Sequence, residues 1–197
     1  CLADPAMFLT QLRAILRAAA HGPVHLLIPM LSHVSEIRQS LAFIDRARGQ
    51  LAAKGQAYGA VKVGAMIEVP AAALMVDVFL KYFDFLSVGT NDLIQYTLAI
   101  DRVDESVSHL YDPMHPAVLQ LLARTIEAGH AQGKTVSVCG ELAGDVTMTR
   151  LLLGLGLRSM SMHPSQVLAV KQQVLRSDTR KLRTLALAAL AAEEPAL

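Results

Sequence analysis

Residues 61–70 read VKVGAMIEVP, and residues 83–92 read FDFLSVGTND. Each stretch is a short, nearly continuous apolar run that ends on polar residues, and Pro70 opens a helical pattern after the first of them. Apolar runs of this length are typical of strands that are buried on both faces of a parallel sheet. The two stretches therefore predict parallel strands joined by a helix, which is the repeating unit of an α/β fold.

The same alternation extends along the chain in both directions. The predicted strands are Val24–Met30, Val61–Glu68, Phe83–Gly89, Thr135–Cys139 and Ser159–Met162. The predicted helices begin at Pro5 behind an Asp4 N-cap, at Ser35, at Pro70 (ending near Tyr82), near Leu93 (ending near Ile100), at Pro116 (ending at Gly133) and after an Asp145 cap, and two more follow from Pro164. We find no linker and no repeat, so residues 1–197 are expected to form part of one α/β domain. Its parallel sheet is either open and doubly wound or a barrel.

The composition fits a globular domain with a sizeable core. Of 197 residues, 53% are hydrophobic and 18% are charged, which excludes a disordered chain. The formal net charge is +1, and a basic cluster near the C-terminus is interpreted as a solvated helix face; it consists of Arg176, Arg180, Lys181 and Arg183. No apolar run approaches the roughly 18 residues of a membrane span. Neither nucleic acid nor a membrane is therefore expected as a partner.

The cysteine content favours a cytoplasmic location. Cys1 and Cys139 provide no disulfide framework, which suits a reducing compartment. Because the chain begins with Cys1 and not with Met, native sequence is expected before it. The seven histidines show no metal-ligand spacing, and no P-loop, dinucleotide-binding glycine motif or zinc motif is present.

Functional side chains follow three of the predicted strands at the point where each strand ends. Glu68 ends the second strand, Asp92 closely follows the third, and Cys139 ends the fourth. Ligand sites in parallel α/β folds lie at the carboxyl ends of the strands. Side chains on three successive strand ends converge best in a barrel, so the pattern favours a barrel over an open sheet.

Glu68 and Asp92 are two hard oxygen donors on neighbouring strand ends. Mg²⁺ is commonly held by one or two carboxylates, and substrate oxygens and water complete its coordination. The pair therefore predicts a Mg²⁺ site for a substrate that carries a carboxylate and a phosphate. The structural alternative is that each carboxylate caps the helix that follows it.

The stretch Gly89-Thr90-Asn91-Asp92 lies between a strand and a helix. Gly89 allows close backbone approach, free N–H groups at the helix start can bind an anion, and Asn91 offers an amide donor. Arg102, ten residues after Asp92, is expected to reach a phosphate with its guanidinium. A surface salt bridge is the alternative for Arg102.

Cys139 stands at the end of its strand, directly before Gly140 and Glu141. A thiol with a pKa of about 8.5 is mostly protonated at neutral pH, so it can act as an acid toward an enolate. The alternative is that Cys139 is a small core residue.

Several of these segments resemble the phosphoenolpyruvate–protein phosphotransferases, known as enzyme I of the bacterial sugar phosphotransferase system. The resemblance runs from about Phe8 to Val174. Its most specific stretches are Gly89–Arg102 and Cys139–Asp145, and the sequence Glu-Leu-Ala-Gly-Asp after Cys139-Gly140 separates this family from the related pyruvate phosphate dikinases and phosphoenolpyruvate synthases.

The resemblance implies a fold, a reaction and partners. It implies the (β/α)8 TIM-barrel fold, of which this chain supplies the last five or so βα units, strands 4–8, and the C-terminal helices. Mg²⁺ would be held by Glu68 and Asp92, the substrate phosphoenolpyruvate would be contacted by Thr90, Asn91, Asp92 and Arg102, and Cys139 would protonate the enolate to give pyruvate. The phosphoryl group would pass to a histidine on an N-terminal domain and then to the histidine-containing phosphocarrier protein. The resemblance also implies a cytoplasmic homodimer, in which this fragment alone is inactive.

Three alternatives to this reading remain at the sequence level. One is a related dikinase or synthase, the second is a Mg²⁺-dependent enolate lyase or aldolase on the same barrel, and the third is a dimerisation module without catalysis. The lyase needs the two carboxylates but not Cys139, so the cysteine separates the phosphotransferases from the lyase.

Overall fold

A computed structural model describes residues 2–194 of the chain. Five strands form one parallel sheet in the order in which they occur along the sequence. The strands are β1 (Val24–Ile28), β2 (Val61–Ile67), β3 (Phe85–Gly89), β4 (Thr135–Cys139) and β5 (Ser159–Met160). All four pairings between neighbouring strands are parallel, which confirms the predicted α/β class.

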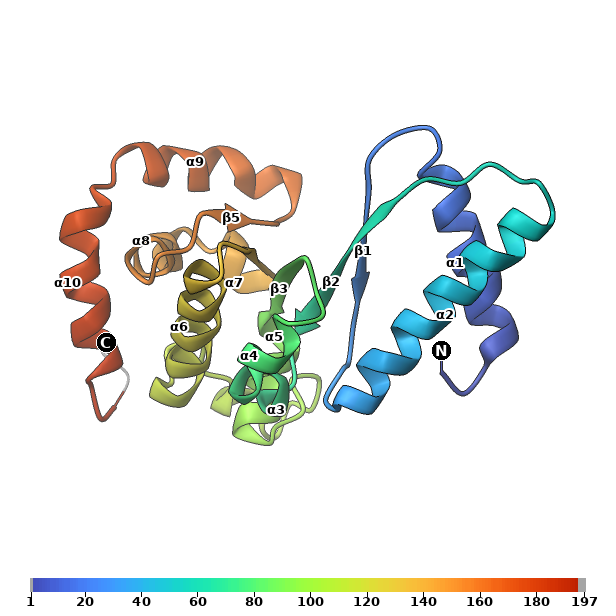
Figure 1. The fold of residues 1–197 in the computed structure, drawn as a ribbon. Coiled ribbons are helices and arrows are strands. Elements are labelled where there is room, and N and C mark those ends of the chain that lie inside the picture. The colour runs from blue at the N-terminus through green and yellow to red at the C-terminus, as the bar shows by residue number, and fades with distance from the viewer. Residues whose placement is uncertain (1, 195–197) are drawn as a thin grey trace.

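Helices fill every connection between strands (Figure 1). They are α1 (Pro5–Ala18), α2 (Val34–Ala53), α3 (Pro70–Leu74), α4 (Val76–Phe79), α5 (Thr90–Leu98), α6 (Pro116–Ala131), α7 (Glu141–Gly144), α8 (Val146–Gly154), α9 (Val167–Leu175) and α10 (Thr179–Leu190), with short 3-10 turns at Ser108–Leu110 and Pro164–Gln166. No helix among the described residues combines the length and the apolar character needed to cross a bilayer.

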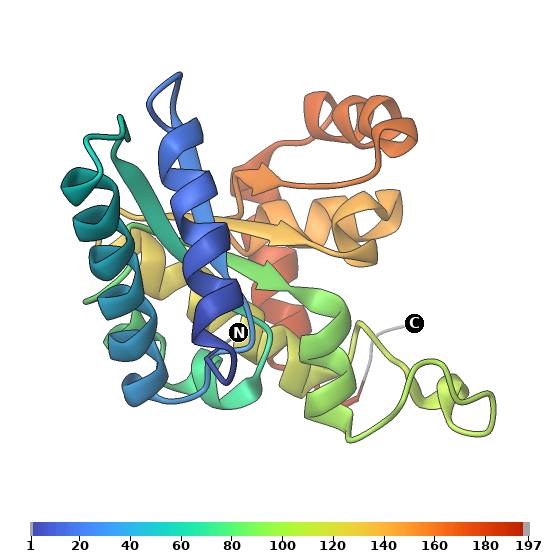
Figure 2. The ribbon, with the colours of Figure 1, turned by 90° about the vertical axis from the view of Figure 1, so that its right-hand side faces the viewer.

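The strand order decides between the two predicted architectures. A doubly wound sheet reverses its strand order at one point, so its helices cover both faces. Here the order runs from β1 to β5 without reversal, and right-handed crossovers then place all the connecting helices on one face. In Figure 2 the arrows of β3, β4 and β5 point the same way. The topology is that of a barrel wall, and the open doubly wound alternative is wrong.

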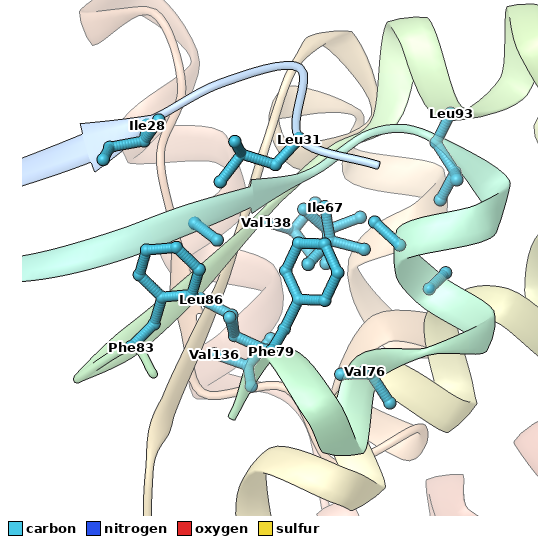
Figure 3. Packing of buried hydrophobic residues seen from close by; sticks show 14 of the residues in the cluster. Ile28, Leu31, Ile67, Val76, Phe79, Phe83, Leu86, Leu93, Val136 and Val138 are labelled. Atoms are coloured by element: carbon cyan, nitrogen blue, oxygen red, sulfur yellow. The ribbon is translucent and has the colours of Figure 1, made fainter. Parts of the chain in front are cut away.

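The helix-facing side of the sheet carries the core. Residues that alternate along the strands and pair in register, such as Ala65 with Leu86 and Leu86 with Val136, are at most 3% exposed. Phe79 and Phe83 pack beneath them from the α4 side, with ring centroids 6.2 Å apart (Figure 3). This apolar layer holds the strands in place, and with them the strand ends that carry the candidate site residues.

The opposite side of the sheet carries a mixture of polar and apolar side chains. Met66, Ser87 and Ser137 are aligned by the register on this face, and Gly89 pairs with Cys139 farther along it. In a closed barrel this face lines the interior. Within residues 2–194 the sheet ends at β1 on one side and at β5 on the other.

Several helix boundaries differ from the predicted ones. The helix predicted from Pro70 to about Tyr82 is interrupted at Met75, whose ψ of 20° departs from helical geometry, and β-branched Val76 and Val78 follow directly. The second helix begins at Val34 and not at Ser35, because His33 and Glu36 form a capping box there. The helix predicted near Leu93 begins at Thr90.

The predicted caps at Asp4 and Asp145 are confirmed. The Asp4 carboxylate accepts a hydrogen bond from the Met7 N–H at 3.1 Å, and the Asp145 carboxylate accepts one from the Thr147 N–H at 2.8 Å. The one-turn helix α7 before Asp145 was not predicted.

Candidate active site

The carboxyl ends of β2, β3 and β4 bring the predicted site residues to one edge of the sheet. Glu68 directly follows β2, Asp92 is the third residue of α5 after β3, and Cys139 is the last residue of β4. Because the three strands are parallel neighbours, their ends lie side by side.

Glu68 is a buried carboxylate, only 3% exposed. Its Oε1 accepts a hydrogen bond of 2.6 Å from the Met30 N–H, which lies just beyond β1. Burial raises the pKa of Glu68 most strongly, the Met30 N–H lowers it, and the neighbouring Asp92 raises it again. The predicted alternative, that Glu68 caps the next helix, is wrong, because the N-cap of α3 is Val69 and has no side-chain hydrogen bond.

Asp92 lies in the first turn of α5, close enough to Glu68 to affect its pKa. It is not the cap of that helix, whose N-cap is Gly89. Neither carboxylate belongs to an ion pair among the described residues. A Cβ at Gly89 would lie 3.0 Å from Glu68 Oε2, so the glycine allows the carboxylate to approach the backbone of β3.

Within residues 2–194, no group of three or more His, Cys, Asp or Glu side chains could hold a metal ion. The pair Glu68 and Asp92 supplies two protein ligands, and Mg²⁺ usually takes its remaining ligands from water and substrate. Glu68 is buried, and neither Glu68 nor Asp92 forms an ion pair within residues 2–194. Two neighbouring carboxylates of this kind could hold a divalent cation.

Thr90 and Asn91 connect the start of α5 to the end of β4. The Thr90 hydroxyl donates to the Cys139 carbonyl oxygen at 2.8 Å, and Asn91 Oδ1 accepts from the Glu141 N–H at 3.0 Å. Thr90 is fully buried, so its hydroxyl is committed to the protein, whereas the Asn91 amide nitrogen makes no hydrogen bond among the described residues.

Gly140 makes this connection possible. Its φ of +93° and ψ of −176° lie in a region that is essentially restricted to glycine. A Cβ at this position would also lie 2.5 Å from Thr90 Oγ1.

The Cys139 thiol is half-buried and faces an open cleft, not the core. The Sγ atom lies 3.3 Å from the Val88 carbonyl oxygen and 3.6 Å from Ser87 Oγ. The cleft has a volume of about 420 Å³ and is lined by Asn91, Cys139, Gly140, Glu141, Ser161, Met162, His163 and Gln166. The predicted alternative of a core cysteine does not describe this position.

Arg102 lies in the exposed loop after α5, where its N–H donates to Gln95 Oε1 at 3.4 Å. Its charge reaches Tyr111: burial raises the pKa of Tyr111 most, Glu141 raises it, Arg102 lowers it and Asp92 raises it. Asp92, Arg102 and Glu141 therefore each lie close enough to Tyr111 to affect its pKa. The sequence analysis did not assign Tyr111 or Glu141 to the site, although Glu141 lies in the Cys139–Asp145 stretch that carries the resemblance.

Comparison with known proteins agrees with these features. The family model for the PEP-binding domain of PEP-utilising enzymes matches residues 1–179. Phosphoenolpyruvate–protein phosphotransferase from Cupriavidus necator is 60% identical over 195 residues, and the one from Lactococcus lactis is 46% identical over 189 residues. These alignments cover 98% and 95% of this chain but 33% of each relative, so the chain spans about a third of the length of the curated relatives it matches.

Similar solved structures support the fold. A citrate lyase from Burkholderia xenovorans has a TM-score of 0.61 at 24% identity and covers 95% of this chain and 60% of its own. Malate synthase from Haloferax volcanii, solved as a lead(II) complex, has a TM-score of 0.60 at 18% identity and covers 91% and 55%. At this identity the likeness concerns the fold alone. Together with the family match it confirms the (β/α)8-barrel class, with five βα units in this chain.

Proposed function

Because the chain belongs to the PEP-utilising enzymes, as their PEP-binding domain, we propose that it is the substrate-binding part of a phosphoenolpyruvate–protein phosphotransferase, enzyme I of the sugar phosphotransferase system. Residues 1–197 would supply barrel strands 4–8 and the C-terminal helices. The observation that carries the proposal is the placement of Glu68, Asp92 and Cys139 at one edge of a parallel sheet. The similarity to phosphotransferases from two bacterial species supports it.

In this proposal Glu68 and Asp92 hold Mg²⁺. Their shared negative charge and the burial of Glu68 favour a hard divalent cation. When bound, Mg²⁺ neutralises charge on the phosphate and enolate oxygens of the substrate. The Met30 N–H keeps Glu68 oriented toward the strand ends through its 2.6 Å hydrogen bond.

The phosphoryl group is bound by residues that follow β3. The Asn91 amide nitrogen and the Arg102 guanidinium donate hydrogen bonds to its oxygens, and the guanidinium adds positive charge. Thr90 supports the pocket through its hydrogen bond to Cys139 O. The phosphoryl group would then move to an incoming histidine: a P–N bond forms in line with the P–O bond that breaks, and the enolate leaves.

Cys139 completes the reaction as a general acid. The S–H bond breaks, and a C–H bond forms at the methylene carbon of the enolate, which gives pyruvate. The accepting histidine would lie on an N-terminal domain outside this chain, which would pass the phosphoryl group to the histidine-containing phosphocarrier protein. We further propose that the complete protein is a cytoplasmic homodimer.

The test uses the complete protein with Mg²⁺ and phosphoenolpyruvate labelled in its phosphoryl group. We expect the label to appear on a histidine of the protein while an equal amount of pyruvate is released, and we expect a metal chelator to stop both. Pyruvate release without label on the protein would contradict the proposal. So would label transfer that survives complete removal of the metal.

A further inference from the structure

Ser87 is a polar residue in the middle of the apolar strand β3, and it is only 5% exposed. Its neighbours along the strand, Leu86 and Val88, face the core and are fully buried. Ser87 instead points to the other face of the sheet, where it pairs in register with Ser137. A buried hydroxyl is costly unless it forms a hydrogen bond, so the partner of Ser87 is informative.

The partner of Ser87 is the Cys139 thiol. Ser87 Oγ lies 3.6 Å from Cys139 Sγ, and among residues 2–194 this is the one hydrogen bond that the Ser87 side chain makes. The sulfur has a second partner, the Val88 carbonyl oxygen at 3.3 Å. A carbonyl only accepts, so the S–H donates to Val88 and the Ser87 hydroxyl donates to the sulfur.

We propose that Ser87 is a positioning residue that stabilises the Cys139 thiolate formed each time the thiol gives up its proton. The proposal rests on the proposed function for the identity of the proton acceptor. In the step, the S–H bond breaks, its electron pair stays on sulfur, and the proton forms the new C–H bond of pyruvate. The Ser87 O–H remains bonded to the thiolate until water returns a proton to it.

Among residues 2–194, no side chain other than Ser87 donates a hydrogen bond to this sulfur. The Val88 carbonyl oxygen accepts from the thiol and has no hydrogen to donate to a thiolate. Glu141 from α7 and His163 from the loop after β5 are the titratable side chains that line the same cleft, and a carboxylate opposes a second negative charge nearby. The Ser87 hydroxyl is the donor in contact with the sulfur.

The test compares Ser87→Ala with Ser137→Ala in the complete protein. Ser137 is a matched control, because it lies directly opposite Ser87 on the same face but donates to the Leu86 carbonyl oxygen at 3.4 Å and not to the sulfur. The rate of Cys139 alkylation by iodoacetamide is measured against pH, and mass spectrometry separates its peptide from that of Cys1. Both variants keep Glu141 and His163, so any effect of these two residues on the alkylation of Cys139 is the same in both.

For Ser87→Ala we expect the midpoint pH of alkylation to rise by about one unit, which is roughly tenfold less thiolate at a given pH, as for a lost hydrogen bond to a charged group. Ser137→Ala should leave the midpoint unchanged. Ser87→Thr keeps a hydroxyl and should move the midpoint back toward the original value. An unchanged midpoint in Ser87→Ala, or equal shifts in both alanine variants, would overturn the inference.

Turnover gives a second readout. Ser87→Ala should lower kcat for pyruvate formation by about tenfold while KM for phosphoenolpyruvate stays the same, because the residue acts on proton transfer and not on binding. A raised KM with unchanged kcat would contradict a role in proton transfer. If the original protein does not turn over phosphoenolpyruvate at all, the proposed function fails, but the alkylation experiment still decides whether Ser87 stabilises the thiolate.

Discussion

The hydroxyl of Thr90 donates a hydrogen bond of 2.8 Å to the backbone carbonyl oxygen of Cys139. Thr90 begins α5 and Cys139 ends β4, so this bond connects the loops that follow two neighbouring strands. The bond from the Glu141 N–H to Asn91 Oδ1 reinforces the connection. The positions of Asp92 and Cys139 relative to each other are therefore fixed by contacts that involve neither of their side chains.

Replacing Thr90 by Val should weaken this connection. Val has nearly the same shape but no hydroxyl, so the Cys139 carbonyl loses a donor, and we expect stability to fall by about 1–3 kcal/mol. Turnover should fall as well, because the cysteine is no longer held. Thr125→Val is the control: Thr125 is equally buried, but its hydroxyl bonds to the Leu121 carbonyl oxygen within α6. Urea unfolding and steady-state kinetics measure both effects; equal losses of turnover in the two variants would contradict the assignment.

Replacing Glu68 by Gln should raise the stability of the metal-free protein and weaken its stabilisation by Mg²⁺. The pKa of Glu68 is raised, mainly by burial, so the carboxylate costs stability as the pH rises through that pKa. Above it, the metal-free Gln variant should be more stable than the original protein. It should also lose the stabilisation that Mg²⁺ and phosphoenolpyruvate give together, because one anionic ligand is gone.

Asp92→Asn should likewise weaken the response to Mg²⁺. The control for both variants is Asp84→Asn, because Asp84 also accepts from a backbone N–H, that of Val63 at 2.8 Å, but lies at the opposite end of the sheet. Thermal unfolding with and without Mg²⁺ and phosphoenolpyruvate gives the comparison. A metal response that is unchanged in both site variants would refute the metal assignment.

The sheet could be predicted because each strand is a short apolar run of its own. Apolar residues such as Leu86 and Val88 predict a buried strand even when the position of that strand in the sheet is unknown. A polar residue after each run predicts where the strand ends. The three functional strand ends favoured a barrel over an open sheet. The order of the strands, which decides between the two, came only from the structure. The roles of Glu68, Asp92 and Cys139 stay predictions.

What the sequence could not give are contacts between distant residues. The Met30 N–H that holds Glu68 comes from a residue 38 positions away, and Ser87 lies 52 positions from the thiol it contacts. Both contacts depend on strand register, which local periodicity does not specify. The end of α3 before Met75 was not predicted for a different reason. The Ala-rich sequence of α3 favours a helix that continues, whereas the backbone leaves helical geometry at Met75.

Cys139→Ser should separate substrate binding from turnover. A serine hydroxyl is a far weaker acid than a thiol, so pyruvate formation should fall by about 10²–10⁴-fold, the scale of lost acid catalysis. Binding of phosphoenolpyruvate, followed by calorimetry, should survive because the two side chains are nearly isosteric. Equal loss of binding and turnover would mean that Cys139 is a packing residue. Full turnover in Cys139→Ala would favour a lyase.

Gly140→Ala should damage the site more than an alanine at another glycine with positive φ. At Gly140 the backbone lies in the glycine-only region, and the new Cβ would collide with Thr90 Oγ1. Gly133 also has a positive φ, of +64°, but a Cβ there meets nothing within 4 Å. Gly133→Ala should therefore cost only about 1 kcal/mol of stability and leave kcat alone. Similar kinetics in the two variants would show that the collision has no consequence for the site.

This chain on its own should transfer no phosphoryl group. Within residues 2–194 the sheet has free edges at β1 and β5, and an apolar groove of about 690 Å³ lies between α1, β1 and α2 beside the first edge. Five strands cannot satisfy the matched tilt and shear that close an eight-stranded barrel. The free edges should then drive self-association, which sedimentation measures.

The decisive assay incubates the purified chain with Mg²⁺ and labelled phosphoenolpyruvate, alone and with a separately produced protein that carries the N-terminal remainder. We expect no pyruvate from residues 1–197 alone, because five strands do not close an eight-stranded barrel and the proposed accepting histidine would lie outside these residues. Addition of the remainder should reduce self-association and restore label transfer, since both free edges of the sheet then find partners. The matched control adds the same remainder to the Cys139→Ser chain, which should reassemble equally well but release little pyruvate. Steady pyruvate release by the unaided chain would show that five βα units suffice for the reaction and that the barrel need not close.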